Sequence, residues 1–158
     1  PTEDEIFTWY GHGPHECYVD RKMGAAVGVY RSTVDDEYVP YIKPQEYGNK
    51  TDVRWAALTD PEGRGLLVAG MPLLEVSAHH YTAQDLARAD HTFELVRRPE
   101  VILNVDLAQS GLGSAACGPG TLPKYQLTAR GYRYCFRLRP LEAGDEPMQL
   151  ANVQFPCP

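Results

Sequence analysis

The sequence predicts an all-β protein, an antiparallel β-sandwich with one short helix. Its hydrophobic residues mostly alternate with polar ones, which is the period of a strand that buries one face. Thirteen prolines and 14 glycines separate these segments, and short strands with frequent turn residues are typical of a sandwich. A chain of 158 residues suffices for one core of ordinary size, so we expect one domain over residues 1–141. The alternation then fades, and residues 142–158 are predicted to be a C-terminal tail.

The strand predictions follow the chain in order. A first strand is expected at residues 53–58, and the Pro-Glu-Gly of residues 61–63 predicts a turn before a second strand at 65–69. Further strands are expected at residues 73–78 and, with the strongest alternation, at 101–108 and 132–139. Residues 83–89 predict the one helix, because Thr82 can cap its N-terminus and Asp85 stands at the capping-box spacing.

Charge and cysteine usage limit the partners and the compartment. Fifteen basic and 21 acidic residues give a net charge of -6, so the chain lacks the basic footprint that nucleic acids require. The longest apolar run, residues 66–74, is too short to span a bilayer, and the N-terminus does not read as a signal peptide. Four cysteines without a CxxC motif favour a reducing, cytoplasmic compartment, although a disulfide between two of them remains open. The start at Pro1 suggests a piece of a longer polypeptide.

Residues 9–21, WYGHGPHECYVDR, look like an active site. Glu16, Asp20 and Arg21 could supply a general acid, but an ion pair that fixes a turn would give the same pattern, and we favour the structural interpretation. The aromatic and proline-rich residues 38–46 could line a sugar site or cover a sheet edge.

Residues 111–120 form a glycine-rich loop between two predicted strands. Pro119 and Pro123, with no helical period after them, argue against a phosphate loop, so a plain linker and a binding loop both remain open. Ser114 lacks the GxSxG elbow of a serine nucleophile, and Cys117 has no base partner at a diagnostic spacing. These residues therefore predict no catalytic group.

The other titratable residues give no chemical site by spacing. His79 and His80 are adjacent in a predicted strand, so their side chains leave from opposite faces and are expected to be structural rather than metal ligands. A retaining glycosidase needs two carboxylates about 5 Å apart. No spacing in the sequence pairs the candidates, which are Glu16, Glu46, Asp52 and Asp106.

Four ordered blocks between Trp9 and Leu141 carry a resemblance. The blocks are GPHE with Tyr18 and Asp20-Arg21, YVPYIKPQE with Gly48-Asn49 and residues 51–55, SAHHYT with Asp85-Leu86, and Asp106 followed by residues 111–114. Together they resemble the C-terminal small-chain region (domain 5) of glycoside hydrolase family 2 β-galactosidases. The resemblance implies a supersandwich related to the galactose mutarotase fold, of which this chain is only the second half.

The resemblance also implies where the chemistry lies. In the family the catalytic glutamates and the catalytic Mg²⁺ site lie in a TIM barrel of about 250 residues, which cannot fit in this chain. No residue here therefore inherits a catalytic or metal-binding role, and the Mg²⁺ and Na⁺ of the parent enzyme are expected mainly elsewhere. The isolated chain is expected to be inactive.

The glycine-rich loop is the expected contact with substrate. In the family the corresponding loop reaches the active site and carries a tryptophan that stacks on the leaving-group sugar; alignment on Pro119 puts Cys117 in that place. Ser114, Cys117 and Gly118 are therefore the candidate substrate-binding residues. Because a thiol offers little flat surface, we expect weaker aglycone discrimination than in relatives with tryptophan.

The function implied is that of a non-catalytic domain of a β-galactosidase that hydrolyses terminal non-reducing β-D-galactose residues, as in lactose. Its expected partners are the TIM barrel and other domains of the parent, the galactoside substrate and further copies in a homo-oligomer. Two alternatives are kept. Ten tyrosines and two tryptophans could make a carbohydrate-binding module, and fold analogy allows an aldose mutarotase.

Overall fold

The computed structural model describes residues 5–113 and 118–153. The main elements in chain order are β1 (Ile6–Gly13), β2 (Ala26–Thr33), β3 (Lys50–Thr59), β4 (Gly65–His79), α1 (Ala83–Arg88), β5 (Ile102–Asp106), β6 (Phe136–Leu141) and α2 (Pro147–Ala151). Three short 3-10 turns lie at Lys22–Gly24, Thr92–Glu94 and Pro123–Tyr125. The predicted strands at 53–58, 65–69 and 73–78 fall within β3 or β4. The strand predicted at 101–108 extends beyond β5 at both ends.

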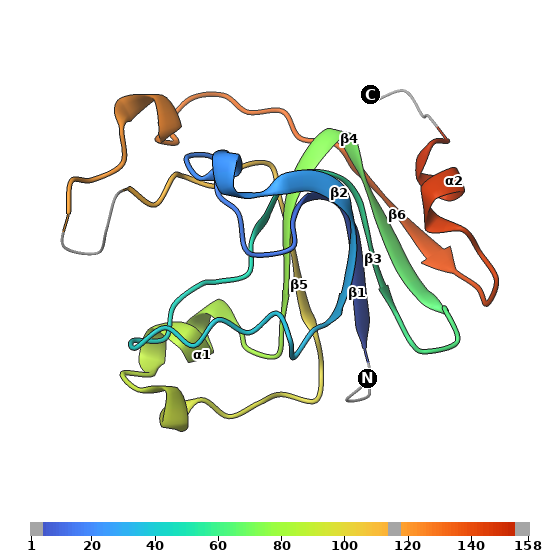
Figure 1. Ribbon diagram of the computed structural model, residues 1–158, viewed down its shortest axis with the longest axis horizontal. Helices are drawn as coiled ribbons and strands as arrows, with labels where there is room; N and C mark the ends of the chain where they lie inside the picture. Colours follow the sequence, from blue (N-terminus) through green and yellow to red (C-terminus); the bar gives the residue numbers. More distant parts are fainter. Residues whose placement is uncertain (1–4, 114–117, 154–158) are drawn as a thin grey trace.

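The six strands form one antiparallel sheet in the order β2-β1-β3-β4-β5, with β6 also paired to β4 (Figure 1). The long strand β4 organises this sheet, because its first part pairs with β6 and its last part with β5. The prediction of two strands in this region is wrong, since both parts pair with β3 across a register shift and belong to one strand. The all-β antiparallel fold class is confirmed.

The sheet carries a hydrophobic layer on each face, in a sandwich-like manner. One cluster contains Phe7, Trp9, Val53, Val68 and Val76, among others. The second cluster contains Trp55, Ala57, Leu67, Ala69 and Leu141, with the partly buried Leu150 and Ala151 of α2 packed against it. Alternate residues of each strand serve opposite faces, so both layers come from the same strands.

Strands β1 and β2 were not anticipated from the sequence. In β1 buried and partly buried residues alternate along the whole strand, but its apolar signal is interrupted by Gly11 and His12, and glycine has low strand propensity. Strand β2 has the same weakness at Gly28. The two strands pair with each other over eight residues, and this pairing stabilises strands that the local sequence does not indicate.

The last predicted strand, at residues 132–139, is displaced toward the C-terminus. Strand β6 begins at Phe136, which pairs with Gly70. The register of β3 with β4 shifts just beyond that point, so residues 132–135 have no regular strand to pair with. Tyr134 instead packs against the first hydrophobic cluster.

The helix prediction is confirmed, and a second helix is added. Helix α1 begins after Thr82, whose side chain accepts a hydrogen bond from the Asp85 amide while Asp85 accepts one from Thr82, which completes the capping box. Helix α2 lies within the segment expected to be a tail. It packs against β3 and β4, and Arg137 donates a hydrogen bond to the carbonyl of Leu150 at 2.5 Å.

The structure decides the question of a disulfide, which the sequence left open. Cys17 is a buried free thiol, whereas Cys135 is disulfide-bonded. Among the described residues, no helix is long and apolar enough to cross a membrane.

Candidate functional site

The described part of the glycine-rich loop has a closed base. The Gly111 amide donates to the carbonyl of Tyr125 at 2.8 Å. The Thr121 hydroxyl donates to the carbonyl of Gly111 at 2.6 Å, and the Leu127 amide donates to the Ser110 hydroxyl at 3.0 Å. The two ends of the loop are therefore joined. Gly118 is exposed, whereas Ser114 and Cys117 lie outside the described residues.

Asp20 fastens the start of this loop to the opening stretch of the chain. Its carboxylate accepts hydrogen bonds from the amides of Leu112 at 3.2 Å and Gly113 at 2.9 Å. These donors lie 92 and 93 positions further along the sequence. No spacing rule could have identified this loop as the partner of Asp20.

Glu16 joins the opening stretch to the aromatic, proline-rich segment. It accepts hydrogen bonds from the Tyr41 hydroxyl and, at 3.0 Å, from the Gly48 amide, and the Arg21 guanidinium lies 3.6 Å away. A cavity of about 470 Å³ lies beside them, with Pro14, Glu16, Tyr38 and Pro40 among its lining residues. These contacts agree with the structural interpretation of Glu16 and Arg21.

A cluster of buried polar side chains surrounds Cys17 of the opening stretch. The Asn49 amide nitrogen donates to the Cys17 carbonyl at 2.9 Å and to a carboxylate oxygen of Glu75 at 2.7 Å. The Thr51 hydroxyl also donates to the Cys17 carbonyl, at 2.7 Å. Burial raises the pKa of Glu75 to about 7, against the opposing effect of the Asn49 hydrogen bond. Glu75 is therefore a carboxyl group that titrates near neutral pH.

Lys50 is completely buried beneath the same region. Its ammonium group lies 2.5 Å from a carboxylate oxygen of Glu37, donates to the Pro14 carbonyl at 2.9 Å and lies 4.4 Å from the centre of the Trp9 ring. Burial lowers the pKa of Lys50, while Glu37 acts in the opposite direction. No sequence signal had marked Lys50, because a lysine is usually exposed and its acidic partner is 13 residues away.

The two adjacent histidines each form a hydrogen bond with a backbone carbonyl, which agrees with a structural role. The His79 ring forms a hydrogen bond of 2.7 Å with the Tyr47 carbonyl and stacks on the Tyr47 ring. The His80 ring bonds the Arg98 carbonyl at 3.1 Å. Burial lowers the pKa of His79. Within residues 5–113 and 118–153, no group of three or more histidine, cysteine, aspartate or glutamate side chains is arranged to hold a metal ion.

Of the remaining candidate carboxylates, Asp52 pairs with basic side chains, whereas Glu46 lies within reach of the charge of Asp106. Asp52 accepts two hydrogen bonds of 2.8 Å from the Lys22 ammonium group, and His12 lies 3.2 Å away. Glu46 is exposed, and its pKa is raised by partial burial and by the charge of Asp106. Asp106 itself accepts a hydrogen bond from the Gln109 side chain at 2.8 Å. These contacts hold Asp52 and Asp106 to neighbouring side chains.

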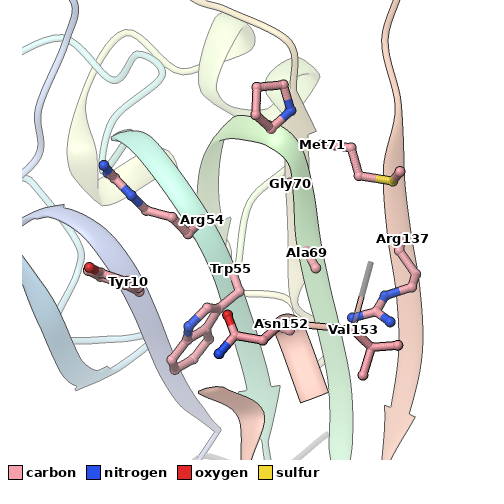
Figure 2. Close-up of a pocket in the computed structure, with 11 residues that line it drawn as sticks. Tyr10, Arg54, Trp55, Ala69, Gly70, Met71, Arg137, Asn152 and Val153 are labelled. Carbon is pink, nitrogen blue, oxygen red and sulfur yellow. The ribbon is translucent and has the colours of Figure 1, made fainter. Parts of the chain in front are cut away.

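A cavity of about 480 Å³ lies between the sheet and the C-terminal end of α2 (Figure 2). Its walls include Tyr10, Trp55 and Met71 from the sheet and Asn152 and Val153 from the chain after α2. Gly118 is not among the lining residues, so this cavity is separate from the described part of the glycine-rich loop. No sequence signal indicated this cavity, because α2 was not anticipated.

Known proteins similar to this chain include several β-galactosidases. A family model described as beta galactosidase small chain matches residues 1–138. A beta-galactosidase of Priestia megaterium is 43% identical over 87% of this chain, and one of Arthrobacter sp. is 35% identical over 88%. Beta-galactosidase BgaC of Bifidobacterium adolescentis is 40% identical over 72% of the chain. The matched region makes up only 13%, 14% and 11%, respectively, of these relatives.

Proposed function

Because the chain belongs to the beta-galactosidase small chain family, we propose that it is a non-catalytic C-terminal part of a retaining β-galactosidase of glycoside hydrolase family 2. The parent enzyme hydrolyses terminal non-reducing β-D-galactose residues, as in lactose. The observation that carries the proposal is the combination of a family match over residues 1–138 with a length of only 13% of the Priestia megaterium relative. The engagement of Glu16, Asp20 and Asp52 in structural contacts agrees with it.

The proposed contribution of this chain is to shape the aglycone side of the active site through the glycine-rich loop. The closed base of the loop and its attachment to Asp20 support this role, since binding residues are commonly held on loops fixed to a rigid sheet. Ser114, Cys117 and Gly118 are the proposed contact residues. In this proposal the catalytic glutamates and the Mg²⁺ and Na⁺ ions of the parent belong to its other domains.

The chain would assemble with the TIM barrel and the remaining domains of the parent, and the parent would form a homo-oligomer in the cytoplasm. The hydrophobic side chains of Val27 and Val29 on β2 are exposed, and exposed apolar surface favours association. The cytoplasmic location is proposed from the cysteine pattern of the sequence, whereas the disulfide at Cys135 is not what a reducing compartment favours.

The two alternative functions have less support. A carbohydrate-binding module stacks sugars on exposed aromatic rings, but Trp9 and Trp55 are only 1% and 3% exposed. A mutarotase needs an acid and a base that reach the sugar. His79 and His80 are instead buried against backbone carbonyls.

The proposal is tested by Cys117→Trp in the full-length enzyme. The added indole should raise acceptor affinity and the share of galactosyl transfer to sugars relative to water, because it restores a stacking surface. Unchanged transfer would refute the loop assignment.

A second sample distinguishes the alternatives. The isotopically labelled chain is mixed with freshly dissolved α-galactose, and anomer interconversion and amide shifts are followed by NMR. The proposal expects neither acceleration nor shifts. Shifts alone would favour a binding module, and acceleration would favour a mutarotase.

A further inference from the structure

We propose that Asp20 is a positioning residue that fixes the base of the glycine-rich loop, and with it the reach of the loop toward the acceptor sugar. This inference rests on the proposed function for its consequence in catalysis. The contact of Asp20 with the amides of Leu112 and Gly113, called the clamp below, rests only on the described residues.

The first support is the bonding of Asp20. One carboxylate receives the successive amides of Leu112 and Gly113, an arrangement in which adjacent backbone N–H groups converge on an anion. Gly113 has a φ of 83°, in the left-handed region that favours glycine and that turns successive amides toward one side. Hydrogen bonds to an ionised acceptor are stronger than those between neutral groups. Asp20 therefore selects one orientation of the chain at the point where the loop leaves the sheet.

The second support is the close approach of Gly111. A Cβ atom at this position would lie 2.7 Å from the Asp20 carboxyl carbon and 3.0 Å from the methyl carbon of Thr121. Gly111 is also bonded on both sides of its peptide, through its amide to Tyr125 and through its carbonyl to Thr121. The clamp therefore depends on complementary features of two segments, a carboxylate at 20 and the absence of a side chain at 111.

The consequence for function is that the base of the loop helps to set where the proposed contact residues lie. In the sequence the proposed contact residues follow Gly113 by one to five positions, so the orientation of the chain at Gly113 is expected to affect the acceptor site. A misplacement of about 1 Å in a positioning group can change a rate by about a hundredfold. Asp20 touches neither substrate nor reacting atoms in this scheme; it acts through the loop.

The experiment uses three single variants of the full-length enzyme. Asp20→Asn replaces one acceptor oxygen with an N–H₂ group, and Gly111→Ala disturbs the same contact from the opposite side. Gly120→Ala is the matched control in the same loop, because a Cβ there would meet nothing within 4 Å. Amide hydrogen exchange at Leu112 and Gly113 should accelerate about tenfold in the first two variants and stay unchanged in the control.

The second readout is the partition of the galactosyl group between glucose and water. Asp20→Asn and Gly111→Ala should lower transfer to glucose about two- to tenfold. Their kcat for o-nitrophenyl β-galactoside should remain within about twofold of the parent, because the chemical step lies elsewhere. A general loss of folding would instead lower both activities together.

The possible results separate the clamp from the proposed function. Unchanged exchange in Asp20→Asn would overturn the clamp, whatever the Cys117→Trp result. Accelerated exchange with unchanged partition would overturn the positioning role. If Cys117→Trp also leaves transfer unchanged, the loop assignment in the proposed function fails as well.

Discussion

Replacing Glu75 with glutamine should stabilise the folded chain above neutral pH and have little effect in acid. Glu75 is only 6% exposed, and burial raises its pKa to about 7 from an ordinary value of 4.5. The folded chain therefore keeps a proton on Glu75 over a pH range in which the unfolded chain has released it. Glutamine keeps an acceptor for the Asn49 hydrogen bond and carries no charge at any pH.

The sign and size of the effect follow from proton linkage. Because the folded state binds more protons between pH 4.5 and about 7, its free energy of unfolding falls as the pH rises through that range. The pKa difference at about 1.4 kcal/mol per unit gives an upper bound of roughly 3 kcal/mol. Partial compensation by the Asn49 hydrogen bond is already contained in that value. We expect a gain of about 1–3 kcal/mol for Glu75→Gln at pH 8.

Urea unfolding of the parent chain and the variant at pH 4.5 and pH 8 measures this difference. The exposed residue Glu62 provides a control, since Glu62→Gln should leave the pH dependence of stability close to that of the parent chain. The reasoning is refuted if the difference in free energy of unfolding between Glu75→Gln and the unsubstituted chain is the same at both pH values.

The other predictions concern three contacts. Lys50→Met should destabilise the chain by about 3 kcal/mol or more, because it leaves the Glu37 carboxylate without its ammonium partner. Adding Glu37→Gln should recover part of this loss in urea denaturation. No recovery would contradict the ion-pair explanation. Glu16→Ala should lower the free energy of unfolding by about 1–3 kcal/mol, since it leaves the Gly48 amide and the Tyr41 hydroxyl without their acceptor. The chemical step of the intact enzyme should stay unaltered. A large loss of turnover in a folded variant would argue for a catalytic Glu16. Thr82→Ala should cost about 1 kcal/mol in thermal unfolding by removing the cap of α1, and an unchanged midpoint would mean that the cap is dispensable.

The sequence predicted best where the interacting residues are neighbours in the chain. The capping box of α1 joins residues three apart. The hydrophobic alternation that predicted strands at 53–58 and 101–108 likewise depends on consecutive residues. The two histidines are also neighbours in the chain, but His79 ends β4 and His80 follows it, so they are not both strand residues. Strands β1 and β2 failed this local test, since their glycines weaken a pattern that pairing then restores.

The site shows the same division. The residue types of the opening stretch indicated a structural role for Glu16 and Asp20, but their partners could not be read from the sequence. Glu16 meets the Gly48 amide 32 positions away, and Asp20 meets Gly113 93 positions away. The residues expected to touch substrate, Ser114 and Cys117, lie outside the described part of the chain, so their role stays a prediction.

By itself the sequence determined the all-β class, the position of α1 and, through its motif blocks, the family resemblance. All three depend on short-range order along the chain. Only the tertiary structure decided that β4 is one strand serving both β5 and β6, that Lys50 is buried against Glu37, and that Asp20 holds the glycine-rich loop. Such contacts depend on which distant segments the sheet brings together, and burial then fixes the strength of each charge and hydrogen bond.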